Sequence, residues 1–63
     1  MSWRTYFDDF DEFEDAITEA ESNAKSGRDM DFVDDLKQRF ALYGQRTNLS
    51  EAQYEWLKRL ARL

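Results

Sequence analysis

The chain has 63 residues, the size of one small domain, and a formal net charge of −5 at pH 7. It contains no Cys and no His, which excludes disulfides, Cys/His zinc sites and catalysis by Ser-His-Asp or Cys-His groups. Aromatic residues make up 16% of the chain, and their burial is the main means of stabilising so short a domain. We therefore expect a single helical domain over residues 1–63 with no enzymatic activity, cofactor or metal. We also expect it to be cytoplasmic and not membrane-bound, since it has no Cys, signal peptide or long apolar run.

The first segment has the apolar spacing of an amphipathic helix. Its apolar residues recur at steps of three and four: Trp3, Phe7, Phe10, Phe13, Ile17, Ala20 and Ala24. Ser2 is a candidate N-cap, and Ser26-Gly27 is a candidate stop. The pattern predicts a helix over residues 3–25. We expect Trp3 and Tyr6, among the aromatic residues, to be partly exposed and available to a partner, because they lie near the terminus.

The second segment begins near Asp29, a good N-cap residue, and predicts a helix over residues 30–43. It carries a second apolar stripe: Phe32, Val33, Leu36, Phe40 and Tyr43. Gly44 follows this stripe at the position where many helices end with a left-handed residue.

The third segment opens with the clearest local motif in the chain. Ser50 and Gln53 have the spacing of a capping box, and Leu49 and Tyr54 have that of a hydrophobic staple. The motif predicts a helix over residues 51–62. Because the connections are short, the sequence predicts an all-α fold, a compact three-helix bundle. We expect the second and third helices to form a hairpin against which the first packs.

The negative charge is concentrated in the first segment. Residues 1–25 have a net charge of −6, residues 26–46 are neutral, and residues 47–63 have +1. On a helix over 3–25, most of the acids lie away from the apolar stripe, and seven like-charged pairs have i,i+3 or i,i+4 spacing. One interpretation is a solvated face that confers solubility. The other is a surface for a basic partner, whose candidate residues are Asp8, Asp9, Asp11, Glu12, Asp15 and Glu19.

Other motifs are incomplete. Asp9 and Asp11 resemble the start of an EF-hand loop, but Phe13 stands at a ligand position and the glycine is missing. The second and third helices have the order of a helix-turn-helix, yet the only basic cluster is Lys58, Arg59 and Arg62. Because the net negative charge repels phosphate, we expect no direct binding of nucleic acid.

Residues 32–60 resemble a helical hairpin found in bacteriophage-encoded proteins. The resemblance rests on Phe32, Leu36, Phe40 and Tyr43-Gly44, followed by Leu49-Ser50, Gln53, Trp56-Leu57 and Leu60. With the small size and the acidic first helix, the chain is similar to phage-encoded inhibitors of the anti-CRISPR and DNA-mimic type. That similarity implies an inhibitor in the bacterial cytoplasm that blocks a basic nucleic-acid-binding surface of a host complex.

Two alternatives remain open from the sequence. The chain is alternatively a structural, assembly or homodimeric interaction module whose acidic face only confers solubility. A third hypothesis is a small DNA-binding regulator that acts through the third helix.

Overall fold

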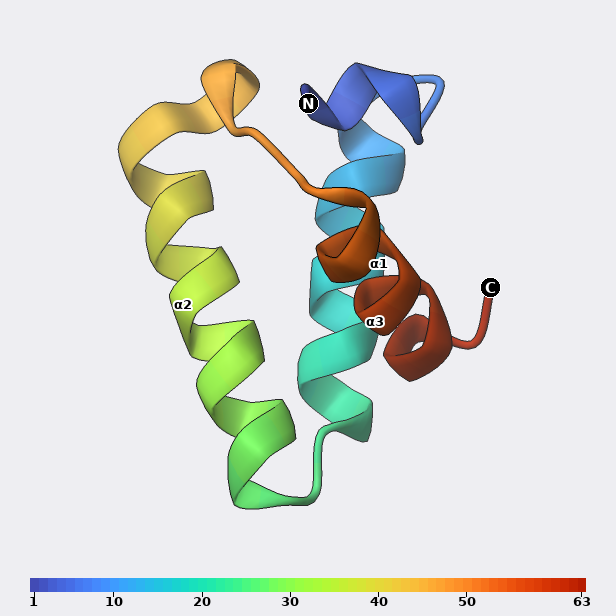
Figure 1. Ribbon diagram of the computed structural model, residues 1–63, viewed down its shortest axis with the longest axis vertical. Helices are drawn as coiled ribbons and strands as arrows, with labels where there is room; N and C mark the ends of the chain where they lie inside the picture. The colour runs from blue at the N-terminus through green and yellow to red at the C-terminus, as the bar shows by residue number, and fades with distance from the viewer.

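The computed structural model describes all residues 1–63 and confirms an all-α, three-helix bundle (Figure 1). The helices are α1 (Phe10–Asn23), α2 (Gly27–Tyr43) and α3 (Glu51–Ala61). Two short 3₁₀ turns, η1 (Trp3–Thr5) and η2 (Gly44–Arg46), flank the first two helices. β-pairing is limited to one isolated antiparallel bridge between Ser2 and Asn48.

The first helix begins later than predicted, at Phe10 instead of residue 3. Asp9 is its N-cap: the residue is extended, and its carboxylate accepts a hydrogen bond of 2.8 Å from the Glu12 amide. The Ser2 hydroxyl caps η1 instead, by accepting from the amide of Arg4 at 3.3 Å. The α-helical spacing of Trp3 and Phe7 is therefore misleading, because both side chains reach the core from the segment before α1.

The segment before α1 is held by the segment that leads into α3. The Trp3 amide donates to the Thr47 carbonyl at 3.4 Å, and the indole Nε1 donates to the Gln45 carbonyl at 3.0 Å. Trp3 is only 3% exposed, so the expectation that it is exposed at the terminus is wrong. Tyr6 is half-buried. Thr47 is fully buried, and its hydroxyl donates to the Gly44 carbonyl at 2.6 Å.

The other helix ends follow local capping chemistry. α2 begins at Gly27, three residues earlier than predicted, because the Ser26 hydroxyl and not Asp29 caps it. Gly44 ends α2 as the sequence predicts and has a positive φ of 54°, but its ψ of −122° lies outside the expected left-handed helical region. At α3 the capping box is confirmed: Ser50 and Gln53 exchange hydrogen bonds of 2.9 and 3.1 Å.

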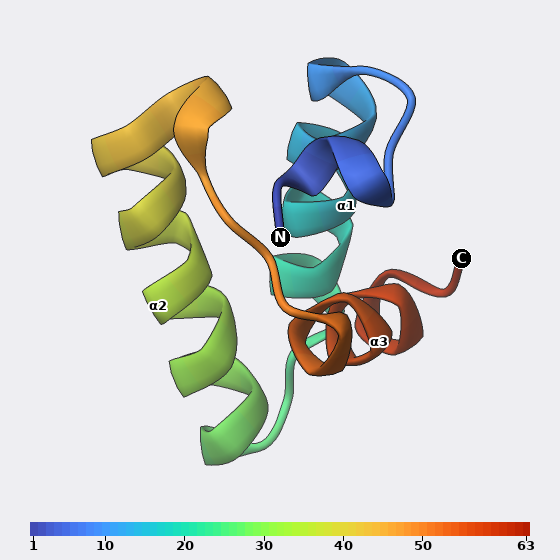
Figure 2. The same cartoon turned by 45° about the horizontal axis from the view of Figure 1, so that its top comes forward.

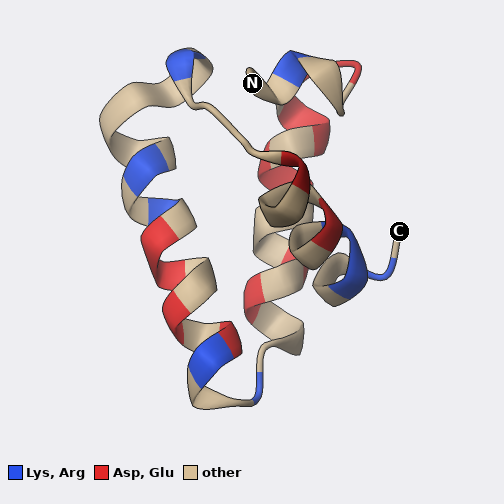
Figure 3. Ribbon diagram, viewed as in Figure 1, with Lys and Arg blue, Asp and Glu red and all other residues tan.

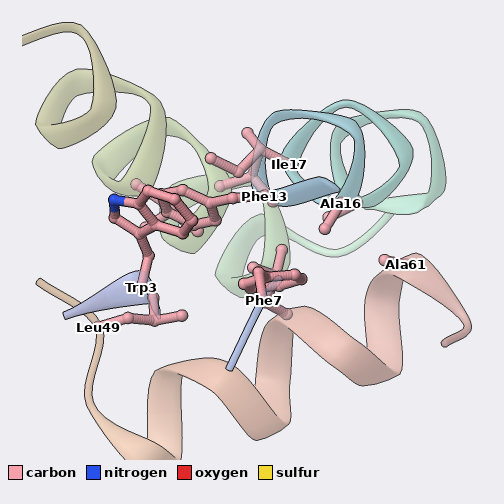
Figure 4. Close-up of a cluster of buried hydrophobic side chains, with 11 residues drawn as sticks. Trp3, Phe7, Phe13, Ala16, Ile17, Leu49 and Ala61 are labelled. Atoms are coloured by element: carbon pink, nitrogen blue, oxygen red, sulfur yellow. The ribbon is translucent and has the colours of Figure 1, made fainter. Parts of the chain in front are cut away.

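Helix α1 is the centre of the bundle. It packs most closely against α3 and less extensively against α2. The predicted hairpin of the second and third helices is wrong, because α3 crosses over α1 instead of lying along α2 (Figure 2). The small residues Ala16 and Ala61 lie on the facing sides of α1 and α3 and allow their close approach (Figure 4).

The core is mainly aromatic and aliphatic. Trp3 stacks on Phe13 with ring centroids 5.9 Å apart, and Phe10 stacks on Phe40 at 4.9 Å. Phe32 of α2 stacks on Trp56 of α3 at 4.3 Å. The buried core comprises Trp3, Phe7, Phe13, Ala16, Ile17, Ala20, Val33, Leu36, Leu49, Leu57 and Ala61. The predicted stripes are exposed at their ends, where Tyr43 and Leu63 are 57% and 68% exposed.

Candidate interaction surface

The six acids singled out from the sequence are all exposed. Four of them lie on α1, and two precede it in the loop that follows η1: Asp11, Glu12, Asp15 and Glu19, then Asp8 and Asp9. The structure contains three ion pairs, Lys37–Glu21, Arg39–Asp35 and Lys58–Glu55, and none involves these six carboxylates. We call these six residues the acidic surface.

The acids repel one another less than they would on a continuous helix over residues 3–25. Asp8 and Asp9 are not helical, so only four of the seven expected like-charged pairs remain within α1: 11–14, 11–15, 12–15 and 15–19. At about 0.2–0.5 kcal/mol each, they cost about 1–2 kcal/mol before screening by salt. The Asp8 amide also donates to the Glu12 carboxylate at 3.1 Å, and Asp9 caps the helix. Part of the negative charge therefore stabilises the helix N-terminus.

Basic residues gather away from this surface. Arg39 and Arg46 line a hollow at the C-terminal end of α2 with Tyr43 and Asn48. Arg4 donates to the Gln45 side chain at 3.4 Å, close to the same end. Figure 3 shows basic residues at the turn after α2, at the start of α2, in the N-terminal segment and at the C-terminal end of α3, while acidic residues follow α1 and the middle of α2.

Glu21 differs from the other acids of α1 because it has a partner. The Lys37 ammonium of α2 donates to its carboxylate, and this hydrogen bond, with the charge of Glu21, raises the pKa of Lys37 above its usual value. Both side chains are about half exposed, so the pair contributes little to stability. It marks the edge of the acidic surface where α1 meets α2.

The acidic surface borders an open hollow with a volume of about 390 Å³. Glu12, Asp15 and Glu19 of α1 form one side of it. The remainder is apolar and aromatic and comes from the N-terminal segment, α1, α3 and the chain end: Tyr6, Phe7, Ala16, Tyr54 and Leu63. Sequence patterns did not reveal this hollow, because Tyr54 and Leu63 reach α1 only through the crossing of α3.

The acidic surface and the hollow beside it offer groups for binding but no cluster of metal ligands. The structure contains no group of three acidic side chains close enough to hold a metal ion. None of its helices has the length and apolar character needed to cross a bilayer. Comparison of the chain with protein-family models, curated proteins and solved structures finds no match.

Proposed function

We propose that the protein is a non-enzymatic binding protein whose acidic surface docks on the basic, nucleic-acid-binding surface of another protein. The observation that carries the proposal is that six exposed carboxylates lie together with no internal ion pair: Asp8, Asp9, Asp11, Glu12, Asp15 and Glu19. By occupying such a surface, the chain acts as an inhibitor, in the manner of phage-encoded DNA mimics and anti-CRISPR proteins.

The charge distribution supports this mechanism in two ways. Carboxylates on successive turns of α1 lie about 5–6 Å apart, a spacing similar to that of phosphates along a nucleic-acid strand. Three of the nine bases are paired with Glu21, Asp35 and Glu55, and none of the nine forms an ion pair with the acidic surface. The electrostatic field of the acidic surface steers a basic partner to α1 and speeds association at low salt.

The test uses charge reversal with a matched control. The variant D8K/E12K/D15K changes the acidic surface, and D31K/D34K/E51K changes the net charge equally on exposed positions elsewhere. Wild-type protein and both variants are used to capture proteins from a bacterial lysate, after circular dichroism has shown that each is folded. We expect wild type and control to retain a basic nucleic-acid-binding protein that salt releases and an oligonucleotide displaces. Equal capture by D8K/E12K/D15K contradicts the proposal.

A second candidate function is a homodimeric or assembly module. It is favoured by exposed large apolar side chains on α2, among them Met30, Leu42 and Tyr43, which are 53–75% exposed. Sedimentation at several concentrations separates the two functions. The assembly module is supported by a dimer that neither salt nor D8K/E12K/D15K affects but that Leu42→Lys abolishes. In that case the acidic residues serve only to keep the protein soluble.

A further inference from the structure

The hollow beside α1 combines two unlike walls. One wall carries the carboxylates of Glu12, Asp15 and Glu19, which are exposed and have no ion-pair partner. The other wall is apolar and includes the buried side chain of Phe7, while the small, buried Ala16 lies among the carboxylates on α1. Its volume of about 390 Å³ lies within the range of ligand-binding pockets, about 300–1,000 Å³. Because it lies open at the surface, it suits a side chain presented by another protein.

The apolar wall is held in place before any partner arrives. The rings of Tyr6 and Tyr54 are stacked, with centroids 4.3 Å apart, and Phe7 meets Tyr54 edge-on at 5.7 Å. The Lys58 ammonium lies 5.4 Å from the centroid of the Tyr54 ring but pairs with Glu55 at 3.6 Å. Neither Lys58 nor any other base forms an ion pair with the three carboxylates of the other wall. A preformed site of this kind loses little conformational entropy on binding.

The chemistry of the two walls selects one kind of side chain. Carboxylates three and four residues apart on α1 match a planar guanidinium, which donates several hydrogen bonds at once. Its methylene groups cover the apolar wall, and arginine is less strongly hydrated than lysine. A neutral apolar side chain would leave the carboxylates partly desolvated without partners, and an anion would be repelled. We propose that the hollow receives an arginine side chain of the basic partner, an inference that rests on the proposed function.

The experiment compares two probes of equal charge, a nona-arginine and a nona-lysine peptide, by ¹⁵N NMR titration at low salt. On wild-type protein we expect the arginine peptide to bind about tenfold more tightly. We expect it to shift the amide signals of Tyr6, Ala16 and Tyr54. The variant E12Q/D15N/E19Q should lose this preference, while the matched control D31N/D34N/E51Q, with the same change in charge, should keep it.

A second pair of variants tests the apolar wall. Tyr54→Phe keeps the ring and should keep the arginine preference, whereas Tyr54→Leu removes the ring and should reduce the preference to about twofold or less. Thermal unfolding followed by circular dichroism establishes that each variant is folded at the temperature of the titration.

The outcomes separate this inference from the proposed function. If both peptides bind equally and only the acidic residues respond, the arginine site is refuted while the acidic binding surface stands. If neither peptide binds at low salt, both proposals fail. If the protein alone forms a dimer that E12Q/D15N/E19Q abolishes, a second copy occupies the hollow, and the inference is likewise overturned.

Discussion

Replacement of Trp3 by alanine tests whether the N-terminal segment that precedes α1 is part of the core. The Trp3 side chain is 3% exposed, packs on Phe10 and Phe13 with ring centroids 5.3 and 5.9 Å away, and donates to the Gln45 carbonyl. Truncation of a buried tryptophan typically costs about 3–5 kcal/mol. A domain of 63 residues has a total stability of about 3–9 kcal/mol, on the usual scale per residue. We therefore expect Trp3→Ala to lose about a third of the stability of the fold or more.

The assay is urea unfolding followed by far-UV circular dichroism, which does not depend on the indole that is removed. Trp3→Phe retains a ring but loses the hydrogen bond to Gln45, so we expect a smaller loss of about 1–2 kcal/mol. Tyr43→Ala is the matched control, because Tyr43 is 57% exposed and its loss should change stability by about 0.5 kcal/mol or less. If Trp3→Ala unfolds at the same urea concentration as Tyr43→Ala, the N-terminal segment does not contribute to the core, and the reasoning is refuted.

Three further substitutions test local features of the fold by the same assay. Gly44→Ala should destabilise by about 1–3 kcal/mol, because φ is 54° and ψ is −122° at this position, a combination that residues with a Cβ avoid. A neutral result would show that the turn after α2 relaxes freely. Ser50→Ala should cost about 1 kcal/mol by removing the capping box of α3, and Ser50→Asp should restore most of it. Failure of the aspartate to rescue would argue against capping as the cause. Asp29→Ala removes the acceptor of the Trp56 indole, 2.9 Å away, and should cost about 1–3 kcal/mol and change the fluorescence of Trp56 in Trp3→Phe protein. An unchanged spectrum would mean that this link between α2 and α3 is absent in solution.

Features that depend on a few neighbouring residues were predictable from the sequence. The capping box of Ser50 and Gln53 and the helix end at Gly44 are local, because the donor and acceptor lie within four residues of each other. Competition between two local signals was harder to resolve. Asp9 caps the start of α1 from within the apolar pattern that predicted a helix from residue 3. Ser26 caps α2 where Asp29 was expected. In both cases the side chain that reached a free amide determined where the helix began.

The acidic residues of the candidate surface were identifiable from composition, because charged side chains remain at the surface unless they are paired. Their neighbours were not identifiable. Tyr54 and Leu63 are distant in sequence from Glu12, Asp15 and Glu19, and no spacing rule relates them. The part of the apolar lining that Tyr54 and Leu63 supply therefore exists only because α3 crosses α1.

The sequence by itself determined the helical class, the end of α2 at Gly44, the capped start of α3 and the excess of negative charge before residue 26, since each follows from residue types and short-range periodicity. Only the tertiary structure decided that α1 is the central helix and that Trp3, in the segment before α1, is buried in the core. It also brought the apolar wall next to the carboxylates of α1. The physical reason is that helix packing depends on the shapes of surfaces distant in sequence, such as the close approach at Ala16 and Ala61, which the periodicity of one helix does not encode.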